Sequence, residues 1–392
     1  MGFKILFDRE DVLEILKETL EKYFVQRTEE EVHIEYSNKV RPESFVLVPK
    51  LGMIMRPFPC KEIRKHYYDS YNIRDSIVKN FGAKLLVFIA THSKRLLSLP
   101  QYLNVKPFDI VGDKTIFAVC NRTIRIFDYN TGSTVSIQKA GFSDKYFKQH
   151  LAFRINSAYD FVPPLLSYGN SWFEEKILDG VMLARVTDKA AYSRAIEYAL
   201  NDMSLIAKNT LQYLDAQTYL FDLVEYIKKN LKKALDIKEI SSFDSAEQYI
   251  SLLEKQALHI DEPIPTVVSH GDFQGGNILV TSDNVWIIDW ETNGRRSAWF
   301  DAITLQFATR YHGGIMQLTK VCMENDTIQK MMRVYECEFE PKKIVTIFLL
   351  EDMKFYLEDM LELPGSAGKL SFDNYMQEII ETNWEEFFSA SS

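Results

Sequence analysis

The chain has 392 residues, of which 46% are hydrophobic and 26% are charged, and its net charge is −9. This length favours two or three structural units, and the composition is that of a folded protein. The acidic balance disfavours a nucleic-acid binder, which normally carries a basic surface, and the apolar stretches are too short to span a bilayer. The N-terminal sequence resembles neither a signal peptide nor a transit peptide, so we expect a cytoplasmic protein without a membrane partner.

The first hundred residues show helical and strand-like patterns without a chemical motif. Apolar residues recur at helical spacing from Val12 to Phe24, which predicts a helix. Further along, the sequence predicts strands at Val32 to Tyr36, Phe45 to Val48 and Met53 to Met55, a helix over residues 61–81, and an apolar run from Lys84 to Ala90. Residues 1–105 are thus predicted to form a small α/β unit, which could extend the next unit, shape a binding site, or mediate a contact with a protein partner or a second copy of the chain.

The next segment is predicted to be rich in β-strands. A boundary is expected between Leu99 and Asp109, where Pro100 and Pro107 occur. Strand-like runs separated by turn sequences follow at Thr115 to Val119, Thr123 to Tyr129 and Ser133 to Gln138. A helix from Asp144 to about Ile155 and a strand pair ending at Asp179-Gly180 complete a unit over residues 106–180. The remainder, residues 181–392, is predicted to be mainly helical.

One strand-like segment, Ile264 to Glu291, interrupts this helical remainder and carries the chemistry. It reads as a short strand, the loop His270-Gly271-Asp272, and a hairpin with a turn near Asp283. A three-residue turn would place Asn277 opposite Asp289, and a two-residue turn would shift this pairing by one place. An amide oxygen and a carboxylate at the open end of a hairpin suit a hard cation such as Mg²⁺.

Asp272 lies five residues before Asn277, in a loop that also contains Gly271, Gly275 and Gly276. Glycines permit tight backbone paths close to a ligand. A carboxylate in this loop could accept the proton of an attacking hydroxyl next to a metal-bound phosphate. The segment therefore predicts phosphoryl transfer with Asp272 as the base.

The motifs HGDFQGGN and IIDWE together resemble those of the aminoglycoside phosphotransferase and choline kinase-like superfamily of small-molecule kinases. The resemblance implies a two-lobed, protein-kinase-like α/β (α+β) fold with a β-rich N-lobe and a mainly helical C-lobe, here with the extra N-terminal unit. It also implies ATP and Mg²⁺ as cofactors and a hydroxyl on a small molecule as acceptor. Carried over to this sequence, it makes Asp272 the catalytic base and Asn277 and Asp289 the Mg²⁺ ligands, while His270 orients the loop and Asp301 is structural.

The resemblance also implies a nucleotide site in residues 106–180. Lys139, which ends the third strand, is the candidate for the α- and β-phosphates. Arg122 lies in the loop where the phosphate-covering loop is expected, although this loop contains no glycine, and the helix after Lys139 contains no Glu. Gln149, His150 or a residue elsewhere remains as the partner of Lys139.

Two further groups of residues are candidates for ligand contacts. The segment around Glu175 and Ile177 resembles the family's hinge, whose backbone would contact the adenine. Trp290, Glu291 and Arg295 follow the metal loop and are candidates for the acceptor pocket.

Three functions are compatible with this sequence. The first is an active kinase that phosphorylates a sugar, an amino alcohol, a glycan precursor or an aminoglycoside-like molecule. The second is a pseudokinase that binds nucleotide or acts as a scaffold, which the glycine-free loop favours. The third, a protein kinase, is disfavoured because His-Gly-Asp and Asp-Trp-Glu replace that family's His-Arg-Asp and Asp-Phe-Gly.

Overall fold

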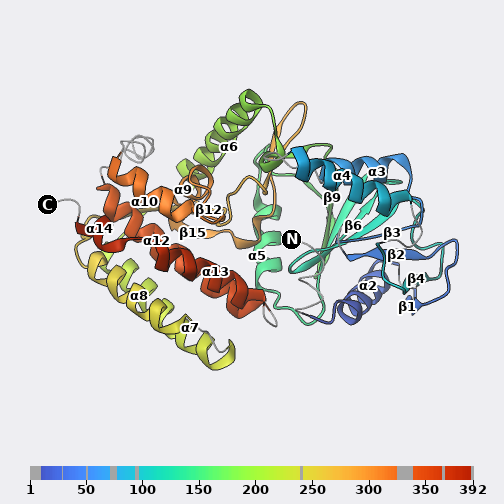
Figure 1. Cartoon of the computed structure of the whole chain (residues 1–392), viewed down its shortest axis with the longest axis horizontal. Helices are drawn as coiled ribbons and strands as arrows, with labels where there is room; N and C mark the ends of the chain where they lie inside the picture. The colour runs from blue at the N-terminus through green and yellow to red at the C-terminus, as the bar shows by residue number, and fades with distance from the viewer. Residues whose placement is uncertain are drawn as a thin grey trace. The chain divides into compact units, whose positions relative to one another are not determined.

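The computed structural model describes residues 10–28, 30–49, 52–70, 77–92, 97–238, 242–324, 339–363 and 367–389. The chain divides into two compact units. The first, which we call the sheet unit, holds Met1–Ala195 and Ile278–Ile288, and the second, the helical unit, holds Ile196–Asn277 and Asp289–Ser392. Figure 1 shows the elements of each.

A nine-stranded antiparallel sheet forms the centre of the sheet unit, in the order β1-β4-β2-β3-β5-β6-β7-β9-β8. Its strands are β1 (His33–Ser37), β2 (Phe45–Val48), β3 (Met53–Met55), β4 (Tyr102–Lys106), β5 (Thr115–Val119), β6 (Thr123–Asp128), β7 (Ser133–Gln138), β8 (Leu165–Tyr168) and β9 (Trp172–Lys176). Because β3 pairs with β5, the hydrogen bonding continues across the boundary that the sequence predicts near residue 105. The first predicted unit therefore extends the sheet of the second.

Each face of this sheet is covered by helix. Successive side chains of a strand point to opposite faces, so the alternate residues of β2 divide between two apolar clusters. Phe45 and Leu47 pack in a cluster with helix α2 (Val12–Thr28), through Leu16 and Leu20. Val46 and Val48 pack in a cluster with α3 (Lys61–Ser70) and α4 (Ile77–His92), which lie together on one face in Figure 1.

The remaining elements of the sheet unit include a second, three-stranded sheet in the order β10-β13-β14. Its strands are β10 (Val181–Met182), β13 (Ile278–Val280) and β14 (Val285–Ile287), and the unit also contains α5 (Lys145–Asn156) and η2 (Leu183–Arg185). The hairpin of β13 and β14 is thus supplied by a late segment of the chain. Helix α6 (Lys189–Thr210) carries the chain from the first unit into the second.

The helical unit is centred on α12 (Pro341–Glu362), which contacts α7 (Ala216–Lys238), α8 (Phe243–Ala257) and α13 (Ala367–Glu381). Apolar residues are buried on every side of α12, as expected for a core helix. Further helices among the described residues of this unit are α9 (Phe300–Gln306), α10 (Gly314–Glu324) and α14 (Trp384–Ser389). A small sheet in the order β11-β12-β15 completes the unit, with β11 (Gln212–Leu214), β12 (Ile264–Ser269) and β15 (Gly294–Ser297).

The predicted fold class is confirmed, since a β-sheet unit is followed by a mainly helical one. The helical stretch predicted over residues 61–81 falls on α3 and α4, with residues 71–76 outside the described ranges, and the apolar run Lys84 to Ala90 lies in α4. Strand β4 was missed because Pro100 and Pro107 suggested a linker, whereas these prolines flank the strand without interrupting it.

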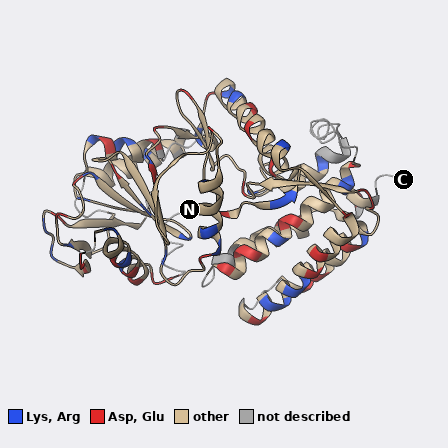
Figure 2. Ribbon diagram, turned by 180° about the vertical axis from the view of Figure 1, so that it is seen from behind, with Lys and Arg blue, Asp and Glu red and all other residues tan. Residues whose placement is uncertain are grey.

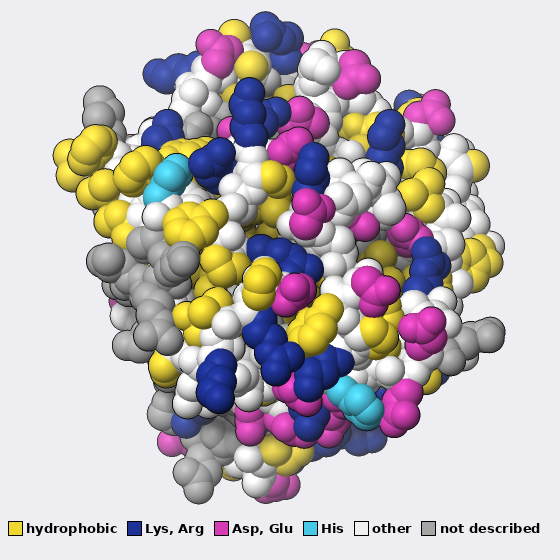
Figure 3. All heavy atoms as spheres, turned by 90° about the vertical axis from the view of Figure 1, so that its right-hand side faces the viewer, with side chains coloured by type: hydrophobic (Ala, Val, Ile, Leu, Met, Phe, Trp, Pro, Cys, Tyr) yellow, Lys and Arg dark blue, Asp and Glu magenta, His cyan; other side chains and the backbone are white. Residues whose placement is uncertain are grey.

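Charged residues are mixed over the surface. Acidic and basic positions are interspersed along the helices in Figure 2, and the face in Figure 3 combines basic, acidic and hydrophobic side chains. In the part of the chain that the structure describes, no helix is both long enough and apolar enough to cross a membrane.

Candidate active site

The loop from His270 to Asn277 leaves the end of β12, which is held between β11 and β15. Gly271 adopts φ +86°, and a Cβ atom there would lie 2.3 Å from the backbone oxygen of Thr292. Only glycine fits this close approach without displacing the backbone. The first glycine of the motif is therefore required by the path of the loop.

Asp301 anchors the start of this loop from the first turn of α9. Its carboxylate accepts hydrogen bonds from the Ser269 hydroxyl at 2.9 Å, the His270 amide at 2.7 Å and the Gly271 amide at 3.0 Å. Asp301 is 7% exposed, so it holds the backbone and presents little surface to a ligand. This geometry agrees with the structural role that the sequence predicts for it.

His270 lies beneath the loop, with its side chain fully buried. Its ring packs on Trp290, with centroids 4.5 Å apart, and its Nδ1 accepts from the Asp272 amide at 3.3 Å. The Thr292 hydroxyl donates to the His270 carbonyl at 3.2 Å. His270 thus supports the loop from within, through its Nδ1 and its carbonyl.

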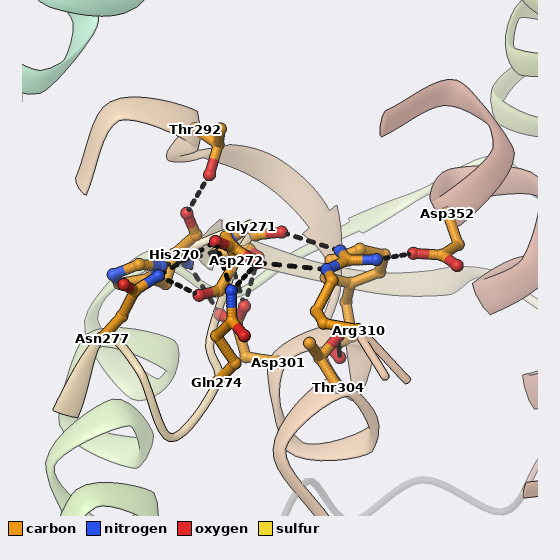
Figure 4. A network of polar contacts seen from close by, with 12 residues as sticks. His270, Gly271, Asp272, Gln274, Asn277, Thr292, Asp301, Thr304, Arg310 and Asp352 are labelled. Atoms are coloured by element: carbon orange, nitrogen blue, oxygen red, sulfur yellow. Dashed lines mark hydrogen bonds and ion pairs between the residues drawn. The ribbon is translucent and has the colours of Figure 1, made fainter. Parts of the chain in front are cut away.

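Asp272 is the acidic group that this scaffold presents, and its side chain keeps 23% of its surface exposed. Figure 4 shows three side chains directed at its carboxylate. Gln274 Nε2 donates to both oxygens at 3.0 and 2.9 Å, Asn277 Nδ2 donates to Oδ2 at 3.0 Å, and Arg310 Nε donates to Oδ1 at 3.1 Å. The predicted base is therefore held in one orientation while part of it remains open to solvent.

Arg310 and Asp352 belong to this network and were missed by the sequence reasoning. Burial by itself lowers the pKa of Arg310, but the neighbouring carboxylates of Asp352 and Asp272 raise it above its ordinary value. Arg310 is therefore a permanent cation beside the base. No motif marks either residue, since both lie outside the segment Ile264 to Glu291 and meet it only in the folded chain.

Asn277 and Asp289 flank the β13–β14 hairpin, and the register is the one that a two-residue turn gives. Thr281 pairs with Asn284 across a two-residue loop, and Ile278 pairs with Ile287. Continued by one residue, this pairing places Asn277 opposite residue 288, because only Ser282 and Asp283 lie in the loop. The shorter turn, which the sequence left open, is the one observed.

Asp289 follows the end of β14 in a left-handed conformation, with φ 67° and ψ 54°. Such a backbone is uncommon for a residue other than glycine and is concentrated at functional sites. It ends the strand alternation and begins the short helix η3 (Trp290–Thr292). The direction of the Asp289 side chain is thus set by this local turn and no longer by cross-strand pairing.

Asn277 and Asp289 could hold a cation whose other ligands come from phosphate and water. The Asn277 amide nitrogen donates to Asp272 O and Oδ2, and these contacts do not use the amide oxygen. Among the described residues, no group of three or more His, Cys, Asp or Glu side chains could hold a metal ion. Oxygens of Asn277 and Asp289 would therefore be completed by phosphate and water, the usual arrangement for Mg²⁺.

Lys139 directly follows β7, and the structure identifies its carboxylate partner. Its Nζ lies 2.5 Å from Oε1 of Glu10, and both side chains are at most 2% exposed. The same ammonium donates to the Asn121 carbonyl at 3.1 Å. The sequence suggested Gln149, His150 or a residue elsewhere as the partner of Lys139. The partner is Glu10, which lies just before α2.

The other predicted nucleotide residues are also engaged within the sheet unit. Arg122 lies in the short β5–β6 loop, with its guanidinium 4.2 Å above the Tyr146 ring. Glu175 pairs with Arg154 at 2.8 Å. The backbone N–H of Ile177 donates to the Gly132 carbonyl at 2.9 Å, so this donor of the predicted hinge is already used inside the sheet unit.

The three acceptor candidates lie in different environments. Trp290 is fully buried against His270, a position that supports the loop and leaves no face for an acceptor. Arg295 donates to the carbonyls of Thr210 and Thr266, each at 3.0 Å, and so ties the end of α6 to β12. Glu291 is partly exposed in η3.

Comparison with known protein families gives one match, to the family described as "Phosphotransferase enzyme family", over residues 174–319. This segment is similar to that family. The match confirms the resemblance carried by HGDFQGGN and IIDWE and supports a small-molecule kinase. The matched segment contains the loop from His270 to Asn277, the β13–β14 hairpin and Asp301. No protein of curated function matches the sequence.

Several solved structures are similar to this chain at low sequence identity. An ethanolamine kinase from Plasmodium vivax is 14% identical, with 84% of this chain and 95% of that chain covered and a TM-score of 0.45. A choline/ethanolamine kinase family protein from Mesorhizobium loti is 15% identical, with 69% and 88% covered and a TM-score of 0.46. A thermostable mutant of an aminoglycoside phosphotransferase, in complex with ADP and hygromycin B, is 12% identical, with 67% and 93% covered and a TM-score of 0.43.

Proposed function

We propose that the protein is an ATP- and Mg²⁺-dependent phosphotransferase that transfers the γ-phosphate to a hydroxyl of a small molecule. The observation that carries the proposal is Asp272, a partly exposed carboxylate held by four N–H contacts above a buried scaffold. The family match over residues 174–319 supports the same chemistry. The acceptor we propose is a sugar, an amino alcohol, a glycan precursor or an aminoglycoside-like molecule.

In this proposal the hydroxyl oxygen of the acceptor attacks the γ-phosphorus of ATP, and Asp272 receives the proton of that hydroxyl. The bond from the γ-phosphorus to the bridging oxygen of the β-phosphate breaks, and ADP leaves. The Oδ atoms are fixed by Gln274, Asn277 and Arg310, so little reorientation is needed before the proton moves. Holding a base in place in this way contributes to the rate because the reacting groups need not search for their geometry.

Asn277 and Asp289 would hold Mg²⁺ through their side-chain oxygens. When bound, the cation neutralises charge on the phosphates and orients them for in-line transfer. The two residues flank one hairpin, so the distance between them depends on the pairing of β13 with β14. The contact from Asn277 to Asp272 at 3.0 Å couples the metal ligand to the base.

Lys139 is our candidate for the α- and β-phosphates, with Glu10 holding its ammonium. Phosphate would take the place of the Asn121 carbonyl, which occupies the ammonium at 3.1 Å. The β5–β6 loop must therefore move slightly for nucleotide to bind. Because only Cys120, Asn121 and Arg122 lie between β5 and β6, the movement involves few residues.

A second candidate function, a pseudokinase, is favoured by the same lysine. The Lys139 side chain is 0% exposed, and an ammonium that stays enclosed would not bind phosphate. In that case the protein would bind nucleotide weakly or not at all and act as a scaffold. The intact set of Asp272, Asn277 and Asp289 favours the enzyme.

The two candidates are separated by measuring ATP turnover against a panel of sugars, amino alcohols and aminoglycosides in the presence of Mg²⁺. We expect at least one acceptor to be phosphorylated, and we expect MgATP to raise the melting temperature. If MgATP does not stabilise the protein and no acceptor is phosphorylated, the enzyme proposal is wrong.

A further inference from the structure

Arg310 lies in the turn that follows α9, and its guanidinium makes contacts in three directions (Figure 4). Nε donates to Oδ1 of Asp272 at 3.1 Å, and Nη2 donates to the carbonyl of Gly271, also at 3.1 Å. Nη1 donates to Oδ1 of Asp352 on α12. One side chain thus joins the proposed base, the backbone of its loop and the central helix of the helical unit.

Helix α12 is built to hold this cation. Asp352 and Phe355 are three residues apart and therefore lie on the same face of the helix. The Asp352 carboxylate binds the guanidinium, and the Phe355 ring lies 4.0 Å from its central carbon. The Arg310 side chain is 5% exposed and that of Asp352 is 0% exposed, so the pair is sealed from solvent.

Stability alone does not account for such a pair. Desolvation of two buried charges offsets most of their attraction, and apolar side chains of similar size often stabilise a protein as well or better. A buried ion pair that also contacts a functional group is better explained by the orientation it imposes. Arg310 makes such a contact, because its Nε holds the carboxylate of Asp272.

The other donors to Asp272 cannot fix its position relative to the protein core. Gln274 and Asn277 lie two and five residues away in the same loop, so they move when the loop moves. Arg310 is 38 residues away and is itself fastened to Asp352, a further 42 residues along. It therefore ties both the base and the loop backbone to α12.

We propose that Arg310 is a positioning residue for phosphoryl transfer, which orients Asp272 while Asp352 holds Arg310 in place. The inference rests on the proposed function. Lysine cannot replace Arg310 in this role, because an ammonium on a flexible stem does not reproduce three hydrogen bonds in fixed directions. The effect should fall on the catalytic step, since Arg310 contacts the base and not the nucleotide candidates.

The test measures kcat and KM for ATP and acceptor in Arg310→Lys, Arg310→Ala and Asp352→Asn. Misplacing a reacting group by about 1 Å costs on the order of 100-fold in rate, so we expect kcat to fall roughly 10- to 100-fold while KM for ATP stays within about twofold. Adding methylguanidinium to Arg310→Ala should restore part of kcat. Arg310→Lys keeps a cation against Asp352 and is the variant expected to fold with near wild-type melting temperature.

Lys343→Met is the matched control, because Lys343 lies on the same helix and pairs with Glu262 at 2.5 Å outside this network. It should leave kcat unchanged. Equal kcat in the wild type and in folded Arg310→Lys and Arg310→Ala would overturn the positioning role and leave the proposed function standing. An inactive wild type would overturn the proposed function and, with it, this inference.

Discussion

Replacing Glu10 with Gln removes the carboxylate that faces Lys139 in the sheet unit. Both side chains are at most 2% exposed, and the two charged atoms are 2.5 Å apart. Removing one partner of a buried pair leaves an uncompensated charge and costs about 3–5 kcal/mol. In Glu10→Gln, Lys139 keeps its bond to the Asn121 carbonyl and its position 5.0 Å from the Phe142 ring. We therefore expect the free energy of unfolding to fall by about 3 kcal/mol, the low end of this range.

A double-mutant cycle identifies this loss with the ion pair. Glu10→Gln and Lys139→Met are compared singly and together by urea unfolding, followed by circular dichroism. The double variant leaves no charge unpaired and should recover at least half of the stability that Glu10→Gln loses. In thermal unfolding, the loss of about 3 kcal/mol corresponds to a decrease of roughly 6–12 °C for a unit of this size.

A destabilisation by Glu10→Gln of less than about 1 kcal/mol, the range measured for exposed pairs, would contradict a buried ion pair. Effects of the two single substitutions that simply add in the double variant would also contradict it. Either result would mean that Glu10 is not the partner of Lys139 in solution.

Two further predictions concern stability. Asp301→Ala removes the acceptor of one hydroxyl and two backbone amides and should destabilise the protein by about 3 kcal/mol or more in urea unfolding. Asp301→Asn keeps one acceptor oxygen and should lose roughly half of that stability. A loss below about 1 kcal/mol for Asp301→Ala would contradict the anchoring role. Burial, with a smaller contribution from Arg185, lowers the pKa of His66 from 6.5 to about 4. The unfolded chain therefore takes up this proton first, so the stability that His66 contributes is complete above pH 6.5 and is lost as the pH falls toward 4. Between pH 7.5 and 5 the wild type should lose about 1–2 kcal/mol more than His66→Gln, and equal losses in the two proteins would contradict this account.

The loop and its hairpin could be predicted from sequence because their signals are local. His270, Asp272 and Asn277 are close in the chain, and the strand that precedes them and the turn that follows have clear turn and strand residues. The strand-like runs likewise predicted β2, β3, β5 and β7 with the observed bounds. These elements are fixed by neighbours in sequence, which pattern and propensity describe well.

The residues that were missed act across long separations. Glu10 meets Lys139 over 129 positions, and Arg310 meets Asp352 over 42. No spacing rule links such pairs, because they are brought together by the packing of α2 on the sheet and of the α9 turn on α12. A lone Glu or Arg in a sequence is usually a solvated side chain, so neither one stood out.

The register of the hairpin depended on a detail that propensity does not resolve. Thr281 and Asn284 pair through backbone and side chain, which leaves Ser282 and Asp283 as a two-residue loop. The sequence Thr-Ser-Asp-Asn accommodates two- and three-residue turns alike, and a change of one residue shifts every pair by one place. The relation of Asn277 to Asp289 consequently rests on the left-handed turn at Asp289.

The most direct test of the central claim compares kcat of the wild type and Asp272→Asn, with MgATP and the best acceptor from the panel. Asparagine preserves the size of the side chain and can still accept from Arg310, but it cannot take the proton of the hydroxyl. General-base catalysis typically contributes about 10²- to 10⁴-fold, so kcat should fall by at least ~100-fold while MgATP still raises the melting temperature. A kcat within about threefold of the wild type would contradict the assignment of Asp272 as the base.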